Sequence, residues 1–563
     1  MKSEILHQKI EYPDMRTFIE RIGETYAGRT AYSFRRNPKD AEVVHVRYEE
    51  LREDVRALGT ALLARGYAGK HCAVVGRLSY AWVCCYYAII SIGAVLVPLD
   101  RDWTVPELTD TLRHADASML LCDGDLAENG EKICETLQLG KVYLLDGEGE
   151  NSVSALIREG KEALASGDRR YYETVPDPEG MSLLVFTSGT TGKGKGVMLS
   201  QRAVIEDLTD VVQYIDFTDK SVGVLPPHHT YGSSVNIFGH NCIGCEVYLS
   251  GGLRYILKEL KEQKPGHLVL VPLYLETFYR KILAGVREQG KEKLFLRMIK
   301  ASNLLRKAGI DIRRKLFASI LNTFGGELRM IVTGGAAINQ EILYLFDSIG
   351  ISVLNGYGIT ECAPIIAVNR SRHVVPGSVG PVLDIDTVRI ADPNEDGEGE
   401  ICVKGPNVML GYYKDEAATA AAFDEEGYFR TGDYGRLDGD GILYITGRLK
   451  NLIILSNGKN VYPEEIESEF VSVPGVQDIV VYEGQSRRGS MYNTIVAEIY
   501  PDKEYIEKNG ITDIRAHLNR YVEDYNRRAV PYKKIGLLRV RDEDFPKNTL
   551  RKIMRFKMDM TID

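Results

Sequence analysis

The sequence predicts an α/β fold with a large N-terminal domain, made of two α/β subdomains and a β-rich one, followed by a small α+β domain. Three observations predict it. The chain has 563 residues, which is too long for one compact unit, because a domain typically holds roughly 100–200 residues. Up to about residue 440, helical patterns alternate with short apolar runs. From Ser378 onward, the runs are separated by glycine and aspartate turns.

The α/β part is defined by helices that alternate with buried strands. The periodicity of Tyr48–Arg65 predicts an amphipathic helix. Apolar runs predict strands at Cys72–Val75, Ser118–Cys122, Leu183–Phe186, Leu268–Val271 and Met330–Val332. Because strands that alternate with helices are typical of βαβ units, we expect parallel sheets.

The most apolar stretch, Ala81–Leu99, resembles a membrane span in length. Ser91 and Gly93 interrupt it, and the residues that follow are typical of a buried strand. We therefore expect a helix end followed by a strand, in a soluble protein. The N-terminus has no apolar segment behind a basic start and does not predict a signal peptide.

The predicted β-rich and C-terminal parts differ from the rest of the chain in their pattern of apolar and turn-forming residues. Short strands are predicted at Thr387–Ile390, Glu400–Lys404 and Leu443–Ile445. The last 115 or so residues combine both patterns. Helices are predicted at Pro463–Phe470 and Ile511–Arg528, and strands at Val476–Tyr482 and Asn493–Tyr500. This mixture predicts a compact α+β unit.

Composition excludes several classes of protein. Hydrophobic residues make up 44% and charged residues 26% of the chain, which is typical of a globular protein. The net charge of −9 argues against nucleic-acid binding and favours small-molecule partners. The nine cysteines are an odd number without a regular spacing, which indicates reduced thiols in the cytoplasm. Cys242 and Cys245 form one CxxC pair near His240, but no second pair completes a metal site.

The strongest local signal is Leu183–Met198, with the sequence LLVFTSGTTGKGKGVM. Glycines let backbone N–H groups approach an anion, and hydroxyls and lysines add donors and charge, so a phosphate-binding loop is predicted. A flexible surface loop is the alternative. Gly189–Lys195 matches the opening of a Walker A loop, but Gly196 stands where that motif needs Ser or Thr, so a P-loop ATPase is disfavoured.

The segment TSGTTGKGKG resembles the phosphate loop of the adenylate-forming superfamily, which includes acyl-CoA synthetases, firefly luciferases and the adenylation domains of peptide synthetases. Gly194 replaces the usual proline. The resemblance implies that ATP phosphates are bound by Thr187, Ser188, Gly189, Thr190, Thr191, Gly192 and Lys195. It also implies that Thr187 lies at the Mg²⁺ ion.

Further motifs of that superfamily follow in order. Pro227–Gly232 resembles the segment beside the acyl site, and the resemblance implies that His229 borders the carboxylate and the α-phosphate. The resemblance implies adenine contacts for the turn with Gly335 and Ala336 and for Tyr357, and ATP binding for Asn355 and Gly356 as well. It assigns Thr360 to phosphate and Glu361 to Mg²⁺. Without the resemblance, the segment Asn355–Glu361 could be a turn with a solvated glutamate.

The longest match is Gly427–Arg448, which on its own could be a run of acidic turns. By resemblance, Asp433 and Arg448 bind the ribose, and Lys450 is the hinge between residues 1–448 and a mobile domain of residues 449–563. Gly458 and Lys459 would line the passage for coenzyme A. The tail PKNTLRKIMR resembles the pattern that carries the catalytic lysine, which falls on Lys552.

The resemblance is to bacterial long-chain fatty acid–CoA ligases and covers nearly the whole chain. It implies ATP, Mg²⁺ and coenzyme A as cofactors, and a medium- to long-chain fatty acid as the substrate. The expected product is an acyl-CoA thioester, formed through an acyl adenylate. A fatty acyl-AMP ligase, a ligase that loads a carrier protein, and a non-catalytic acyl or nucleotide-binding protein remain as alternatives. Oligomeric state and peripheral membrane contact stay open.

Overall fold

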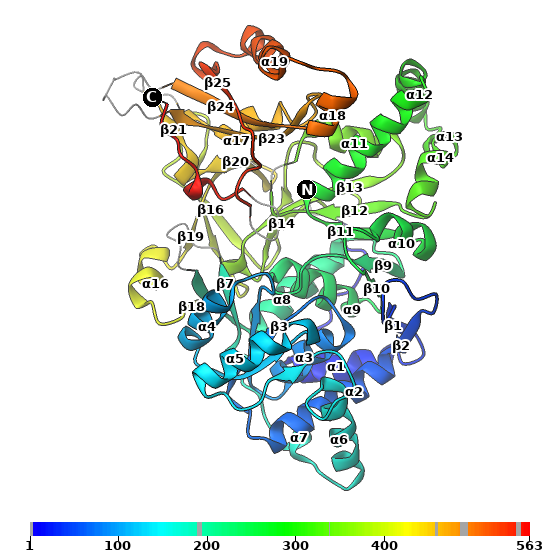
Figure 1. Ribbon diagram of the computed structural model, residues 1–563, viewed down its shortest axis with the longest axis vertical. Coiled ribbons are helices and arrows are strands. Elements are labelled where there is room, and N and C mark those ends of the chain that lie inside the picture. Colours follow the sequence, from blue (N-terminus) through cyan, green and yellow to red (C-terminus); the bar gives the residue numbers. More distant parts are fainter. Residues whose placement is uncertain are drawn as a thin grey trace.

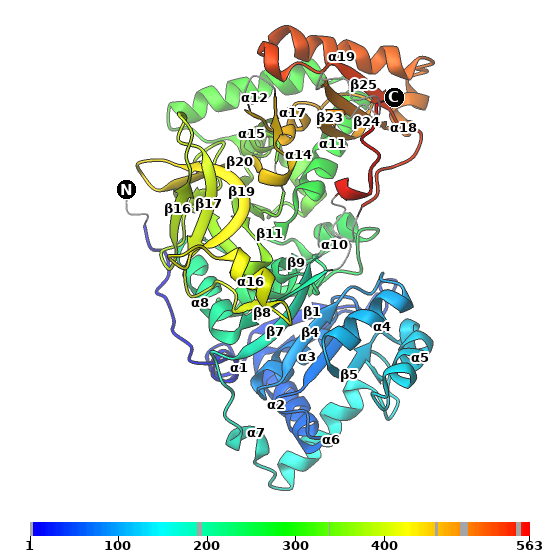
Figure 2. The same cartoon turned by 90° about the vertical axis from the view of Figure 1, so that its left-hand side faces the viewer.

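The computed structural model describes residues 4–187, 194–336, 338–455, 460–484, 494–547 and 553–562. The first helices and a seven-stranded sheet form one end of the molecule, and the last helices and strands form the opposite end (Figures 1 and 2). Most of the green and yellow elements lie between these two ends. The chain thus builds its layers roughly in sequence order.

The seven-stranded sheet has the order β18-β8-β7-β4-β3-β5-β6. Its strands are β3 (His71–Val75), β4 (Val95–Leu99), β5 (Ala117–Cys122), β6 (Tyr143–Leu144), β7 (Met181–Thr187), β8 (Lys195–Ser200) and β18 (Gly411–Tyr412). The accompanying helices are α1 (Met15–Thr25), α2 (Tyr48–Ala64), α3 (Tyr80–Ser91), α4 (Val105–His114), α5 (Ala127–Leu137), α6 (Val153–Ala165) and α7 (Arg170–Glu173). The prediction of a parallel sheet holds from β7 to β6, but β8 and β18 are antiparallel.

The apolar stretch Ala81–Leu99 is a helix and a strand, as predicted. Ser79 begins α3 by accepting a hydrogen bond from the backbone N–H of Trp82. Gly93 adopts a positive φ of 72°, which ends the helix and turns the chain into β4. No helix in the described ranges is long and apolar enough to cross a membrane.

Two further sheets, of four strands each, form the middle of the molecule. Their orders are β2-β1-β10-β9 and β11-β12-β13-β14. The strands are β1 (Thr30–Phe34), β2 (Val44–Arg47), β9 (Lys220–Gly223), β10 (Glu246–Leu249), β11 (His267–Leu270), β12 (Met330–Thr333), β13 (Ser352–Gly358) and β14 (Ile365–Val368). Their helices are α8 (Gln201–Val211), α9 (His240–Cys242), α10 (Ile256–Gln263), α11 (Pro272–Glu288), α12 (Glu292–Lys307), α13 (Arg313–Leu316), α14 (Ala318–Leu321) and α15 (Gln340–Ser348).

The β-rich part is one five-stranded sheet with the order β15-β20-β19-β17-β16. Its elements are β15 (Gly380–Pro381), β16 (Thr387–Ala391), β17 (Gly399–Lys404), α16 (Glu416–Ala422), β19 (Phe429–Leu437) and β20 (Ile442–Arg448). The predicted strands in this part are confirmed. Neighbouring strands are antiparallel throughout, as the short turns between them require.

The C-terminal part packs helices on a three-stranded sheet, β23-β24-β25. Its elements are β21 (Ile453–Ile454), β22 (Asn460–Val461), α17 (Pro463–Ser468), β23 (Val476–Gly484), β24 (Thr494–Pro501), α18 (Lys503–Lys508), α19 (Ile514–Arg528) and β25 (Leu537–Val540). The α+β prediction is confirmed, with α18 as an addition. α19 begins later than predicted, because the Asp513 side chain accepts a hydrogen bond from the Ala516 backbone N–H, 2.8 Å away, and caps the helix there.

A buried acidic joint connects α8 to the β-rich part. The amide of Asn407 donates to Asp386 at 3.1 Å and lies 3.4 Å from Asp207. Within the described residues, Oδ1 of Asp386 is buried without a hydrogen-bond partner. Burial raises the pKa of Asp386 to about 8 and raises the pKa of Asp207 well above its ordinary value. At neutral pH the carboxyl group of Asp386 is therefore mostly protonated.

We expect the protein to lose stability as the pH rises toward 8. The ordinary pKa of Asp386 is 3.8 and its folded value is about 8, so between these values the folded state holds a proton that the unfolded state has lost. Stability then falls with pH by about 1.4 kcal/mol per pH unit for such a group, and the loss is complete above pH 8. Asp386→Asn keeps the hydrogen bond from Asn407 and should flatten the dependence. Thermal unfolding from pH 5 to 9 measures both slopes, and parallel curves would contradict the prediction.

Candidate active site

Three parallel strands bring the predicted nucleotide segments to one edge of a sheet. β11, β12 and β13 are parallel, so their carboxyl ends meet where ligands bind in open α/β sheets. β12 runs into the glycine turn at Gly334, and β13 ends in Tyr357 and Gly358. A Cβ atom on Gly334 would lie 3.1 Å from the carbonyl oxygen of Gly356. The close approach of these two turns explains why the first one is glycine.

A tyrosine, an aspartate and an arginine from three strands form the first cluster. The hydroxyl of Tyr357 donates to Oδ2 of Asp433 at 2.7 Å, and Nε of Arg448 lies 3.0 Å from Oδ1. Asp433 on β19 faces Arg448 on β20 in the ladder register. Burial, and then the Asp433 charge, raise the pKa of the Tyr357 hydroxyl, which stays protonated and donating. The aspartate is only 4% exposed, so its two paired oxygens fix the orientation of both neighbours.

A second cluster joins Glu361 to the end of the glycine-rich loop. β13 leads through Ile359 to a short 3-10 turn, η5 (Thr360–Cys362), which carries Glu361. The hydroxyl of Tyr412 on β18 donates to Oε1 of Glu361 at 3.0 Å. Nζ of Lys195, the first residue of β8, lies 4.3 Å from the centre of the same tyrosine ring. The carboxylate thus lies at the hydroxyl of this tyrosine and the ammonium group lies near its ring.

The tyrosine of this second cluster was not predicted from the sequence. Tyr412 belongs to a two-residue strand that pairs with β8, far away in the chain. Its pKa is raised by burial and then by the Glu361 charge, so its hydroxyl remains a donor. No local pattern marks a residue whose role depends on a contact of this range. Its position two residues after Leu410, at the end of an apolar run, is the only signal in the sequence.

Two histidines begin the segment beside the sheet edge. The rings of His228 and His229 pack with centroids 4.2 Å apart. His228 is buried and lies 3.6 Å from the carboxylate of Asp100, while His229 is more exposed. Burial lowers the pKa of His228, although the Asp100 charge opposes this shift. Next, Tyr231 begins a π-helix, η3 (Tyr231–Gly239), and its hydroxyl donates to the carbonyl of Val332 at 3.4 Å. His229 therefore starts a segment that is anchored to the end of β12.

The remaining predicted residues in the described ranges lie at the same strand ends. Thr187 ends β7 and pairs with Lys195 across the hairpin. Gly335 and Ala336 are exposed on the turn after β12. The amide of Asn355 donates to the carbonyl of Ser378 at 3.4 Å, which ties β13 to the start of the β-rich part. Thr360 is half-buried beside Glu361.

Several predicted residues lie outside the described residues. These are Ser188, Gly189, Thr190, Thr191, Gly192, Gly458, Lys459 and Lys552. Their flanking segments are described. β21 pairs with β22 on either side of the predicted coenzyme A passage, and Lys547 pairs with Ile553 on either side of the predicted catalytic lysine. The predicted roles of these residues stay predictions.

The proposed hinge residue follows the first cluster directly. Lys450 is exposed in a short turn, η6 (Leu449–Asn451), which begins one residue after Arg448. The neighbouring Asn451 donates to Glu464 on α17 at 2.6 Å. The chain therefore leaves the five-stranded sheet at Arg448 and is fixed to the C-terminal part from Asn451 onward.

A buried histidine pair lies near the CxxC motif. Ligand atoms of His240, Cys245 and His267 lie within 4.8 Å of one another. Nδ1 of His240 faces the carbonyl of Asn236 at 3.0 Å and must donate, while Nδ1 of His267 accepts from the backbone N–H of Thr218 at 3.2 Å. The proton on Nε2 of His267 then bonds to Nε2 of His240, 2.8 Å away. Both rings are neutral and fully hydrogen-bonded, and Cys242 is not part of this group.

We expect Asp433→Ala to weaken the use of ATP. Loss of paired hydrogen bonds to a charged group should cost on the order of 2–4 kcal/mol, or roughly 30- to 1,000-fold in kcat/KM for ATP. Each carboxylate oxygen accepts up to two bonds, so Asp433 can bind ribose hydroxyls while it holds Tyr357 and Arg448. Unchanged kinetics would leave Asp433 with a structural role only, as the residue of β19 that holds Tyr357 and Arg448.

The matched control for that substitution is Tyr357→Phe, which keeps the ring and removes only the hydroxyl that donates to Asp433. If Asp433 accepts hydrogen bonds from the ribose hydroxyls, the unchanged protein and Tyr357→Phe should both prefer ATP over 2′-deoxy-ATP. Asp433→Ala should lose most of that preference. A preference that disappears in all variants alike would indicate a general distortion of the site.

Comparison with known proteins gives a family and a fold. A sequence profile described as "AMP-binding enzyme" matches residues 19–413. The chain is 28% identical over 498 residues to long-chain-fatty-acid–CoA ligase 1 of Cavia porcellus, covering 81% of this chain and 69% of that one. It is 27% identical over 565 residues to a chloroplastic long-chain-fatty-acid–acyl-carrier-protein ligase of Arabidopsis thaliana, covering 86% and 76%.

Solved structures share the fold over almost the full length. ATP-bound MatB of Rhodopseudomonas palustris superposes with a TM-score of 0.74 at 24% identity, covering 96% of this chain and 97% of that one. MenE, the o-succinylbenzoate CoA synthetase of Bacillus subtilis, in complex with ATP and magnesium, has a TM-score of 0.71 at 22% identity and covers 96% and 98%. The fold class predicted from the sequence is therefore confirmed.

Proposed function

Because the chain belongs to the AMP-binding enzyme family, we propose that it activates a medium- to long-chain fatty acid with ATP and transfers it to coenzyme A. The family's chemistry is the ATP-dependent, adenylate-forming ligation of an acid. In the first step, a carboxylate oxygen attacks the α-phosphorus of ATP, and the bond to the β-phosphate breaks to release pyrophosphate. In the second step, the thiol sulfur attacks the acyl carbonyl carbon, AMP leaves, and the thiol proton passes to solvent.

The cluster of Tyr357, Asp433 and Arg448 carries this proposal. It supplies an aromatic face for a base, a carboxylate for two hydroxyls and a cation. All three side chains are already oriented by hydrogen bonds to one another, so little ordering is needed when a nucleotide binds. The second cluster adds an ammonium group at Lys195, where the pyrophosphate leaving group would gain its charge.

The oxygen donors near the loop suit a magnesium ion. Mg²⁺ prefers carboxylate and hydroxyl oxygens together with substrate phosphates. Thr187, which pairs with Lys195, supplies a hydroxyl, and Glu361, which is bonded to Tyr412, supplies a carboxylate. When bound, the ion would neutralise charge on the phosphate oxygens. Glu361 would hold it, and Tyr412 would orient Glu361. Tyr412 thus acts as a positioning residue in this proposal.

The same proposal includes two domains, residues 1–448 and 449–563, that turn about Lys450. Polar contacts join the two parts in several places, beside the ring contact of Tyr434 with Tyr462. Lys508 pairs with Glu288 at 2.7 Å, and both side chains are exposed. Arg280 donates to the carbonyl of Gln477 at 3.1 Å. One arrangement would bring Lys552 to ATP, and the other would open the coenzyme A passage.

The fatty acid substrate is supported by the names of two relatives, one a long-chain-fatty-acid–CoA ligase and the other a long-chain-fatty-acid–acyl-carrier-protein ligase. The test is a panel of acids from acetate through aryl acids to long-chain fatty acids, assayed for AMP release that depends on coenzyme A. We expect the highest kcat/KM for chains of medium length or longer. A preference for an aryl or dicarboxylic acid would overturn this part of the proposal and leave the adenylation chemistry intact.

A carrier protein is the second candidate for the thiol. The Arabidopsis relative is named for an acyl-carrier-protein acceptor, and the match to it covers 86% of this chain. Both acceptors end in the same thiol arm, so the nucleotide clusters do not distinguish them. Measuring thioester formation with free coenzyme A and with a carrier protein in parallel assays decides between the two.

A further inference from the structure

α12 is a helix at the outer edge of the molecule in both views (Figures 1 and 2). It packs through one narrow face, where Phe295, Ile299 and Ser302 are buried. These residues are three or four positions apart, as one face of a helix requires. Most of the helix surface therefore faces solvent.

That solvent-facing surface is strongly basic, although the chain as a whole carries a net charge of −9. Residues 291–315 contain nine basic and two acidic residues, a net charge of +7. Within the described residues, no ion pair involves the exposed side chains of Lys293, Arg297, Lys300 and Lys307. They lie along one line of the helix, so their charge is available to an anionic partner.

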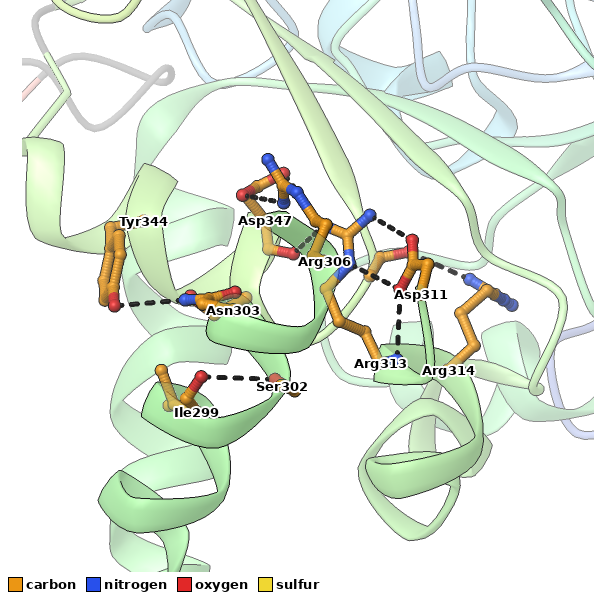
Figure 3. A network of polar contacts seen from close by, with 11 residues as sticks. Ile299, Ser302, Asn303, Arg306, Asp311, Arg313, Arg314, Tyr344 and Asp347 are labelled. Carbon is orange, nitrogen blue, oxygen red and sulfur yellow. Dashed lines mark hydrogen bonds and ion pairs between the residues drawn. The ribbon is translucent and has the colours of Figure 1, made fainter. Parts of the chain in front are cut away.

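The acidic residues near α12 are occupied by other cations, as Figure 3 shows. Asp347 on α15 pairs with Arg306 at 2.6 Å and with Arg313 at 3.0 Å, and Asp311 pairs with Arg313 at 2.7 Å. Glu292 lies 3.3 Å from Arg287. The ion pairs thus brace the end of the helix and leave its basic line unneutralised.

Leucines flank the basic line instead of polar residues. Leu294, Leu296 and Leu304 are 52%, 51% and 69% exposed, and Leu305 is 37% exposed. Just beyond the helix, Ile310 is 53% exposed. Single exposed leucines are ordinary, but four on one helix beside a line of cations are typical of an interaction surface.

We propose that this exposed face of α12, Lys293 to Ile310, docks onto a membrane surface that contains anionic phospholipid. Helices that lie in the membrane interface combine Lys and Arg with Leu on one exposed surface, so that the cations reach lipid phosphates and the leucines enter the acyl boundary. Nucleic acid would match the charge but would leave the leucines in water. The proposal rests on charge and exposure alone, and does not depend on the substrate proposed above.

Sedimentation of the full-length protein with unilamellar vesicles tests the proposal. Vesicles of phosphatidylcholine with 30% phosphatidylglycerol should bind it, more weakly at 500 mM than at 50 mM salt, and pure phosphatidylcholine should not. A basic residue near an anionic leaflet strengthens binding about fivefold. The double variant Lys293→Gln with Lys300→Gln should therefore bind about 25-fold more weakly.

The matched control is Lys70→Gln with Lys141→Gln, which changes the charge equally at exposed lysines on the seven-stranded sheet end and should bind like the unchanged protein. Leu304→Ser should weaken binding about tenfold at every salt concentration, because it removes apolar burial. Equal effects of the two double variants, or equal binding to neutral vesicles, would overturn the proposal. A dimer that Leu304→Ser dissociates would assign the face to a second copy, and DNA binding lost with the lysines would assign it to nucleic acid.

Discussion

Replacing Lys552 by alanine is expected to abolish formation of the acyl adenylate, while supplied acyl adenylate and coenzyme A are still converted to the thioester. A lysine at this position would neutralise the charge that develops as the carboxylate approaches the α-phosphate, and removal of one such donor costs roughly 10²–10³ in rate. The two half-reactions are measured separately, by pyrophosphate exchange and by thioester formation.

The structure holds the residues that flank Lys552 against the three-stranded sheet of the C-terminal part, and Lys547 lies near enough to α11 to act on it electrostatically. Lys547 pairs with Asp478 at 2.8 Å, and its charge acts on Glu276 of α11, whose pKa is raised by burial. The control is Lys557→Ala, an exposed lysine of the same tail, which should leave both half-reactions unchanged. Equal losses in both half-reactions for Lys552→Ala would contradict the two-arrangement account.

Lys450→Pro should show the opposite pattern to Lys552→Ala. Proline fixes φ near about −65°, so rotation at the hinge, and with it the thioester step, should suffer most. Adenylation should persist, provided that the fixed angle suits the arrangement that closes over ATP. If thioester formation is unaffected in this variant, the hinge lies elsewhere.

Glu361→Gln is expected to reduce adenylation by about 10²–10³, and to raise the concentration of Mg²⁺ needed for half-maximal rate. The amide keeps the shape and can still accept the hydrogen bond from Tyr412, 3.0 Å away. Only the charge that would hold the ion is lost. Pyrophosphate exchange over a range of Mg²⁺ concentrations checks both expectations.

The matched control for Glu361 is Tyr412→Phe. This variant removes the hydroxyl that orients Glu361, while the ring that contacts Lys195 remains. Loss of one hydrogen bond to a charged group should cost about 1.5–3 kcal/mol, about 10- to 150-fold, with a smaller change in Mg²⁺ requirement than for Glu361→Gln. Near-normal exchange in Glu361→Gln would remove Glu361 from the metal site.

The fold could be predicted from the sequence because its signals are local. A buried strand such as Met330–Thr333 is a continuous apolar run. The start of a capped helix such as α3 is marked in the sequence by its capping residue, Ser79. The antiparallel edge strand β18 could not be predicted, because two residues are too short for a pattern and their pairing is set by tertiary contacts. The start of α19 was wrong by three residues for a different reason, because the local cap at Asp513 was not recognised.

The sequence offers candidates for the site only where a motif is continuous in the chain. Tyr357 and Glu361 belong to one segment, and the structure brings them to Asp433 and Tyr412 from other sheets. The pairing of Asp433 with Tyr357 depends on how the five-stranded sheet meets the end of β13, and no spacing encodes that. Buried groups such as Asp386 look like turn residues in the sequence, because burial is a property of the assembled layers.

The short distance along the chain from the proposed ribose site to the proposed hinge has a thermodynamic consequence. Arg448 is held by the buried Asp433, and Lys450 follows two residues later. A nucleotide that contacts this pair more tightly in one domain arrangement than in the other shifts the balance between the arrangements by that difference in affinity, and by no more. Replacement of ATP by the acyl adenylate would then change the preferred orientation of the C-terminal domain. No conformational change in the core of the larger domain is needed for this. The nucleotide bound at Asp433 would then determine which domain arrangement is more populated at each step of the reaction.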